Sequence, residues 1–334
     1  MNYQIDKNFL PKLITHWMLS AKVYAPVKME NFTNFEALND VREMVLDGPH
    51  NTRIPPKSLF LPQSEVLFQY KNGSFLPVLS TNDLRIIFGI RPCDAHAVTL
   101  LDSIFDQQEY IDPFWKSRRD RTILVGLGCH QPCNTCFCSS VGSGPFDPKG
   151  LDILMTDLGD VYTLEVLSDK GSTLLNGQMT LSEENQERMV AFQKKAEEGM
   201  PKVFETSGIR EKLYHIFESG YWQKVSQSCL GCGVCTFLCP TCFCFDIVDE
   251  TQRDERVRNW DTCMFRIYSQ EASGHNPHPS RSERTRQRLM HKFAYWLDHI
   301  NQIGCVGCGR CVQYCPVGLD IREMIRQAQA WEAA

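Results

Sequence analysis

The sequence predicts an α+β protein in which an N-terminal α/β lobe with a short parallel sheet precedes a cysteine-rich domain. Two buried-strand patterns flank one helical pattern between residues 84 and 128, and the 16 cysteines gather mainly in three runs. The last two runs share one spacing. A chain of 334 residues is long enough for two or three domains. The expected domains are an irregular lobe at 1–80, an α/β domain with a cysteine cluster at 81–220, and a third domain at 221–334.

Residues 1–80 combine a helical start at Phe9 to Met18 with a proline-rich stretch, RIPPKSLFLPQSEVLFQY, whose prolines interrupt long elements. The first residues lack a basic region followed by an apolar run, so we expect no signal peptide. No apolar stretch approaches the roughly 18 residues of a membrane span. We therefore expect a cytoplasmic protein with reduced cysteines, in which Cys-x2-Cys spacings indicate metal sites. A net charge of −5 argues against nucleic-acid binding.

The segment from 84 to 128 has the pattern of a βαβ unit. LRIIFGI and TILVGLG are strand-length apolar runs, and DAHAVTLLDSIFD between them has helical spacing. A helical crossover makes the two strands parallel. Cys93 follows the first strand and Cys129 follows the second. Both are therefore expected at the carboxyl edge of one sheet, where open α/β sheets bind ligands.

A third metal centre is one interpretation of the cysteines at this edge. Residues 129–138 read CHQPCNTCFC, and their spacing matches no standard motif. A zinc site and a redox or flavin-contacting pocket are the alternatives. The candidate ligands for a third [4Fe-4S] cluster are four of Cys93, Cys129, Cys133, Cys136 and Cys138.

Two further elements follow before the cysteine-rich domain. VYTLEVLS has the pattern of a strand. Thr180 and Glu183 have the spacing of a capping box, which predicts a charged helix running through Glu198.

Two cysteine runs in the last third repeat the spacing Cys-x2-Cys-x2-Cys-x3-Cys-Pro. Three thiolates from a tight loop and a fourth from a distant position suit a [4Fe-4S] cluster, and in two-cluster ferredoxins the fourth cysteine of each run ligates the other cluster. Structural zinc, which needs only two pairs of ligands, is the alternative. We expect a bacterial-type two-[4Fe-4S] ferredoxin domain with an insertion, followed by a terminal helix at IREMIRQAQAWEA. The expected ligands are Cys229, Cys232, Cys235 and Cys315 for cluster 1, and Cys305, Cys308, Cys311 and Cys239 for cluster 2.

Other features of this region have simpler interpretations. Cys242, Cys244 and Cys263 are expected to pack as small buried hydrophobes. The run RSERTRQRLMHK has charges at helical spacing and is expected to form a solvated helix face, with a docking surface for an acidic partner or a flavin phosphate as the alternative. The chain has no dinucleotide fingerprint, Walker loop or nucleophile elbow. We therefore expect no catalytic residues, and electrons that enter from one partner subunit and leave to another.

The chain resembles one family of two-cluster iron–sulfur subunits at several segments between about residue 50 and residue 320. The family includes the β subunit of sulfhydrogenases, an iron–sulfur subunit of anaerobic sulfite reductase, and the iron–sulfur subunit of flavin oxidoreductases linked to heterodisulfide reductase. The segments that carry the resemblance are FGIRPCDAHAV, GCHQPCNTCFC, TDLGD, SCLGCGVCTFLCPTCFC, RNWDTCMF and GHNPHPSRSERTRQRLMHKF.

The resemblance implies an electron-transfer subunit of an oxidoreductase complex. It implies a neighbouring FAD subunit that handles NAD(P)H, and a downstream catalytic subunit of the hydrogenase, sulfite reductase or heterodisulfide-reductase-like kind. The alternative is a redox enzyme with its own flavin or open cluster in the N-terminal lobe, near Cys93 and Cys129.

Overall fold

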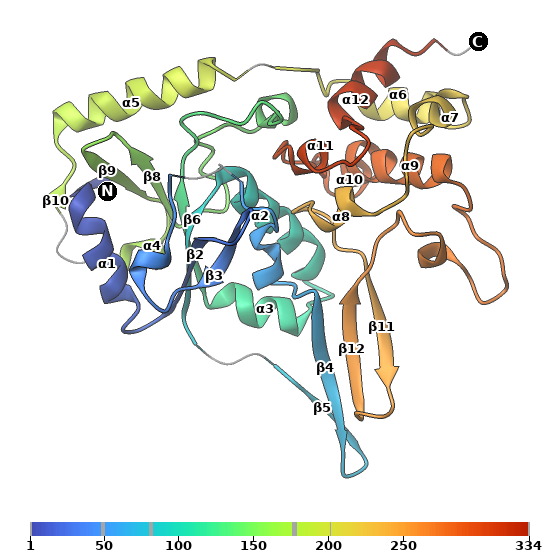
Figure 1. The fold of residues 1–334 in the computed structure, drawn as a ribbon, viewed down its shortest axis with the longest axis horizontal. Coiled ribbons are helices and arrows are strands. Elements are labelled where there is room, and N and C mark those ends of the chain that lie inside the picture. Colours follow the sequence, from blue (N-terminus) through green and yellow to red (C-terminus); the bar gives the residue numbers. More distant parts are fainter. Residues whose placement is uncertain (1, 48–50, 80–82, 176–178, 201, 333–334) are drawn as a thin grey trace. The chain divides into compact units, whose positions relative to one another are not determined.

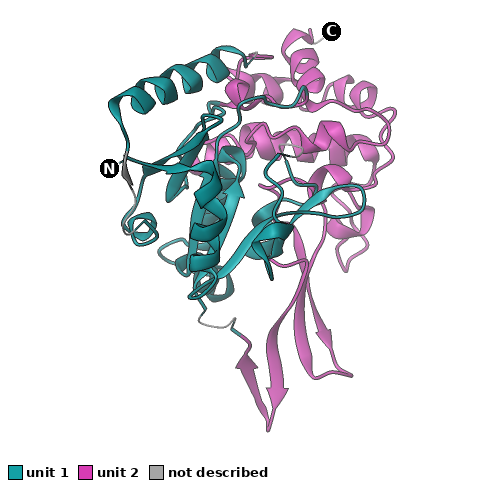
Figure 2. Cartoon of the chain, turned by 60° about the vertical axis from the view of Figure 1, so that its left-hand side comes forward, with its two compact units in different colours: residues 1–60, 79–134, 142–201 teal, residues 61–78, 135–141, 202–334 magenta. Residues whose placement is uncertain are grey.

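The computed structural model describes residues 2–47, 51–79, 83–175, 179–200 and 202–332. The described chain divides into two compact units, each assembled from separate stretches of sequence (Figure 2). Unit 1 comprises residues 1–60, 79–134 and 142–201, and unit 2 comprises residues 61–78, 135–141 and 202–334.

Unit 1 is built on an eight-stranded mixed sheet with the strand order β10-β1-β9-β8-β7-β6-β2-β3 (Figure 1). Strands β2, β6, β7 and β8 are parallel neighbours, and the remaining pairs are antiparallel. The strands are β1 Asn2–Asp6, β2 Lys22–Lys28, β3 Thr33–Ala37, β6 Arg85–Ile90, β7 Thr122–Leu127, β8 Ile153–Asp157, β9 Val161–Val166 and β10 Met179–Thr180.

The predicted βαβ unit is confirmed. Strands β6 and β7 pair in parallel, with Ile87 opposite Leu124. Alternate residues of both strands pack into one core with helix α1, while Ile87 and Leu124 are fully buried as well. Burial on both faces explains why these strands are continuous apolar runs. The helices of unit 1 are α1 Leu10–Trp17, α2 Pro92–Phe105, α3 Pro113–Asp120, α4 Asp169–Ser172 and α5 Glu183–Glu198.

Two expectations for unit 1 need correction. The irregular lobe does not extend over residues 2–37, which supply three strands of the main sheet and helix α1. The charged helix α5 ends at Glu198 as expected, but its N-cap is Ser182, whose hydroxyl accepts from the amide of Asn185. Ser182 therefore caps the helix in place of Thr180, because its hydroxyl reaches an amide of the first turn.

Unit 2 contains both repeated cysteine runs, a cluster of short helices and a four-stranded antiparallel sheet of order β11-β12-β4-β5 (Figure 1). Its strands are β4 Ser64–Lys71, β5 Ser74–Pro77, β11 Phe245–Glu250 and β12 Glu255–Trp260. Its helices are α6 Ile209–His215, α7 Tyr221–Val225, α8 Val234–Phe237, α9 Arg281–Met290, α10 Trp296–Ile300, α11 Arg310–Gln313 and α12 Ile321–Ala330.

A π-helical turn at His291–Tyr295 joins α9 to α10, so one nearly continuous helix runs from residue 281 to residue 300. Its inner face packs with α6, α7 and α12 in the main apolar core of unit 2. The structure divides by contacts into two units, and the three contiguous domains 1–80, 81–220 and 221–334 stay a prediction. Among the described residues, no helix is long and apolar enough to cross a membrane.

Candidate metal centre

The two cysteine runs adopt the same local conformation. Gly231 and Gly233 in the first run have φ of 70° and 76°, and Gly307 and Gly309 in the second have φ of 65° and 75°. These left-handed values favour glycine, because a Cβ would strain the backbone. The second glycine of each run caps a short helix, α8 or α11, that carries the third cysteine. The sequence repeat is therefore a structural repeat.

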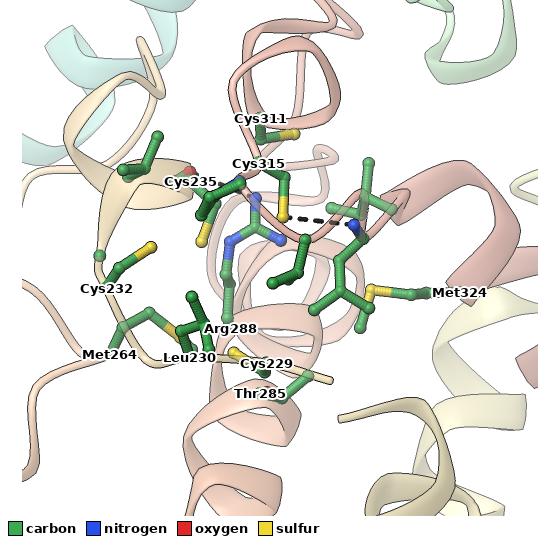
Figure 3. A pocket seen from close by; sticks show the side chains of 16 residues that line it. Cys229, Leu230, Cys232, Cys235, Met264, Thr285, Arg288, Cys311, Cys315 and Met324 are labelled. Carbon is green, nitrogen blue, oxygen red and sulfur yellow. Dashed lines mark hydrogen bonds between the residues drawn. The ribbon is translucent and has the colours of Figure 1, made fainter. Parts of the chain in front are cut away.

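A first cavity, of about 50 Å³, is lined by thiols from both runs. Figure 3 shows the side chains that surround it. Backbone amides also point at its sulfurs: Gly231 donates to Cys229 Sγ over 3.4 Å and Leu319 donates to Cys315 Sγ over 3.2 Å. The cysteines on the wall of this cavity are Cys229, Cys232, Cys235, Cys311 and Cys315.

A second, smaller cavity of about 10 Å³ is also lined by both runs. Cys311 contributes to both cavities. Burial raises the pKa of Cys305 to about 12, so this thiol would stay protonated without a compensating cation or metal. The cysteines on the wall of this cavity are Cys239, Cys305, Cys308 and Cys311.

The crossed arrangement is visible in these two cavities. Cys315, the last cysteine of the second run, lines the first cavity, and Cys239, the last of the first run, lines the second. Each cavity therefore contains the four cysteines that the crossed ligand pattern of a two-cluster ferredoxin assigns to one centre.

The donor set fits iron–sulfur clusters better than single metal ions. Zinc–sulfur bonds are about 2.3 Å long, so the thiolates around one zinc ion crowd together. Within the described part of the chain, no three His, Cys, Asp or Glu side chains converge closely enough to hold a single ion. The eight thiols instead surround two spaces, as a larger cubane requires.

Two buried cations lie among these thiols, and the sequence pattern did not reveal them. Arg288 lines both cavities and Lys292 lines the second, with exposed fractions of 6% and 2%. Burial acts to lower the pKa of Lys292, but the sulfurs of Cys239, Cys242 and Cys305 outweigh it and raise the pKa. The same balance raises the pKa of Arg288. The expectation of a solvated face for the run RSERTRQRLMHK is therefore wrong for these side chains.

Of the five cysteines proposed for a third cluster, three belong to unit 1. Cys93 lies in the first turn of α2, with its sulfur 3.9 Å from Asn51 Oδ1. Cys129 follows β7; burial raises its pKa, against the nearby guanidinium of Arg91. Cys129 and Cys133 are close enough to interact electrostatically.

The other two candidates, Cys136 and Cys138, belong to unit 2. Cys136 Sγ lies 3.7 Å from the carbonyl oxygen of Cys308, and Cys138 is buried. The pool is thus distributed over two units, and the third cluster with any four of these ligands stays a prediction.

The three remaining cysteines lie close to the second cavity. Hydrogen bonds join the thiols of Cys242 and Cys239 and those of Cys263 and Cys244. The first of these contacts, with burial, raises the pKa of Cys242 well above its ordinary value. Cys242 is buried, as expected for a small packing residue, whereas Cys244 and Cys263 are partly exposed.

Comparisons with known proteins agree with this geometry. Residues 228–319 match the family described as "4Fe-4S dicluster domain", so the chain carries two [4Fe-4S] clusters. Over 324 residues the chain is 30% identical to the sulfhydrogenase 2 subunit beta of Pyrococcus furiosus, a match that covers 95% of each chain. No solved structure matches the chain.

Proposed function

Because the chain belongs to the family of the sulfhydrogenase beta subunit, an iron–sulfur electron-transfer family, we propose that it is a relay for single electrons within an oxidoreductase complex. Its proposed partners are an FAD subunit that handles NAD(P)H and a downstream catalytic subunit of the hydrogenase, sulfite reductase or heterodisulfide-reductase-like kind. The observation that carries the proposal is the pair of neighbouring four-thiol cavities that share Cys311 on their walls.

We assign the ligands by cavity. When bound, each cluster supplies reversible one-electron chemistry. The chain's own part is to hold the thiolates in place, to donate amides to the sulfurs and to exclude water. The proposed ligand sets are Cys229, Cys232, Cys235 and Cys315 in the first cavity, and Cys305, Cys308, Cys311 and Cys239 in the second.

The first cavity is the better candidate for exchange with a partner. Cys232 is exposed, and Leu230 and Val317 beside it are 61% and 36% exposed. Cys305, Cys308 and Cys239 of the second cavity are all buried. Electron transfer weakens steeply with distance, so a partner's redox group would approach the rim near Cys232.

The test is to purify the full chain anaerobically and to measure iron, sulfide, zinc and flavin per polypeptide. About eight irons, no flavin and no oxidation of NAD(P)H until an FAD partner is added are the expected results. About twelve irons would add the predicted third cluster, since each cubane contains four. A bound flavin with turnover by the isolated chain would favour the alternative of an active site in the N-terminal lobe. Zinc in place of iron would refute both.

A further inference from the structure

Helix α9 and the π-helical turn after it bury a row of cations. Arg284, Arg288 and Lys292 are spaced four residues apart, so they lie on one face of the helix. Their exposed fractions are 7%, 6% and 2%. The inner face of a helix is ordinarily apolar. Burying a charge is costly unless an opposite charge compensates for it, so this row requires a counter-charge.

Carboxylates do not supply that counter-charge. Among the described residues, neither Arg288 nor Lys292 forms an ion pair with an Asp or Glu. Lys292 Nζ donates to Thr241 Oγ1 over 2.9 Å and to the carbonyl oxygen of Gly304 over 3.0 Å. Arg288 donates to the carbonyl oxygen of Cys235 over 3.3 Å, and its Nε is buried without a partner. These acceptors are neutral, so both positive charges remain uncompensated by the polypeptide's carboxylates.

The thiols are the remaining source of negative charge. Arg288 lies on the wall of both cavities, where it is seen beside Cys235 and Cys315 (Figure 3). Lys292 lies on the wall of the second cavity alone. Four thiolates around a [4Fe-4S] core leave a net negative charge, which increases by one on reduction. The cations therefore face groups whose charge changes during the proposed function.

We propose that Arg288 and Lys292 are fixed counter-charges that raise the reduction potentials of the clusters, Lys292 at the second cavity and Arg288 at both. The inference rests on the two-cluster function proposed above. A buried cation stabilises the reduced, more negative form more than the oxidised form, because Coulomb interactions are strong where water is excluded. Net charge near the cluster is one of the properties that sets its potential.

A purely structural role is the competing explanation. Lys292 links the loop at Thr241 to Gly304, next to the ligand Cys305, and could serve only to hold these segments together. Such a role would change stability without moving a potential in proportion to the charge. The reduction potential therefore separates the two explanations.

The experiment is a potentiometric titration of the full anaerobic chain, followed by EPR, in Lys292→Met and Arg288→Met. In Lys292→Met one cluster should become at least tenfold harder to reduce, a shift of about 59 mV to more negative potential, while the other changes less. Arg288→Met should shift both. Lys292→Arg should titrate like the wild type. Arg326→Gln removes a positive charge whose side chain is 60% exposed in the same unit, and it should change neither potential.

Unchanged potentials in iron-replete Lys292→Met and Arg288→Met would overturn the inference, although the two-cluster function would stand. If Lys292→Met does not retain iron, Lys292→Gln decides, since its amide can still donate to Gly304. A Lys292→Gln chain that titrates like the wild type would refute the role of the charge. Loss of the second cluster in both neutral variants, with retention in Lys292→Arg, would support it. A wild-type chain without iron would instead refute the proposed function.

Discussion

Replacement of Gly307 by alanine tests how tightly the second cysteine loop is packed. Gly307 has φ of +65°, and a Cβ there would lie 2.5 Å from the amide nitrogen of Cys138 and 2.5 Å from the carbonyl carbon of Phe137. Both obstacles are backbone, and Phe137 also donates its amide to the Gly307 carbonyl over 2.8 Å. The segment at 135–141 therefore cannot move aside without breaking that hydrogen bond.

The magnitude follows from two contributions. A left-handed conformation costs an alanine about 1–2 kcal/mol, and overpacking against a rigid neighbour costs about 1–3 kcal/mol more. Gly318→Ala is the matched control, because Gly318 has φ of +66° and a Cβ added to it would meet no described atom within 4 Å. This control should pay only the first contribution.

The assay is thermal unfolding of both anaerobic, iron-replete variants at one scan rate. A free-energy difference of 1 kcal/mol shifts Tm by about 2–4 °C in a domain of this size. Gly307→Ala should therefore melt at least about 2 °C below Gly318→Ala. Equal melting temperatures, or a lower one for Gly318→Ala, would refute the packing argument.

Three further predictions concern other parts of the chain. Glu65→Gln should destabilise unit 2 by about 3–5 kcal/mol in chemical unfolding, because it leaves Arg258 buried without its charged partner; Asp249→Asn, which breaks an exposed ion pair, should have little effect, and equal losses would contradict this reasoning. Burial lowers the pKa of His96 below 6.5, so the unfolded chain takes up this proton first and stability should fall as the pH drops below about 6.5; His96→Gln should flatten the dependence of Tm on pH, and an unchanged slope would exclude His96 as its source. Removal of iron should abolish hydrogen-exchange protection around both cysteine runs but preserve it in β6 and β7, whose core contains no cluster ligand; protection that survives in both units would show that the clusters do not stabilise unit 2.

The features that sequence reasoning predicted are those encoded over short distances. The two cysteine runs, the parallel pairing of β6 with β7 and helix α12 each follow from a local spacing or apolar pattern. The capping of α5 was misassigned by two residues, because Thr180 and Ser182 offer equivalent hydroxyls and only the backbone decides which one accepts.

The features that it missed depend on residues distant in sequence. Strand β4 pairs with β12, which brings Glu65 to Arg258 across 193 residues, and a strand pattern does not specify its partner. The burial of Arg288 and Lys292 was hidden by the ordinary rule that charged helix residues face water. Their spacing of four residues, shared with Arg284, was the available signal, but the cavities that compensate them form only in the folded unit.

The crossed ligation of the two clusters is tested most directly by EPR spectra of three anaerobically reduced variants. Cys232→Ser marks the signal of the first cavity, and Cys308→Ser marks that of the second. Because Cys315 lines the first cavity, Cys315→Ser should alter the same signal as Cys232→Ser and leave the other intact. If Cys315→Ser alters the signal that Cys308→Ser alters, each run holds its own cluster and the account of two centres with exchanged fourth ligands is wrong.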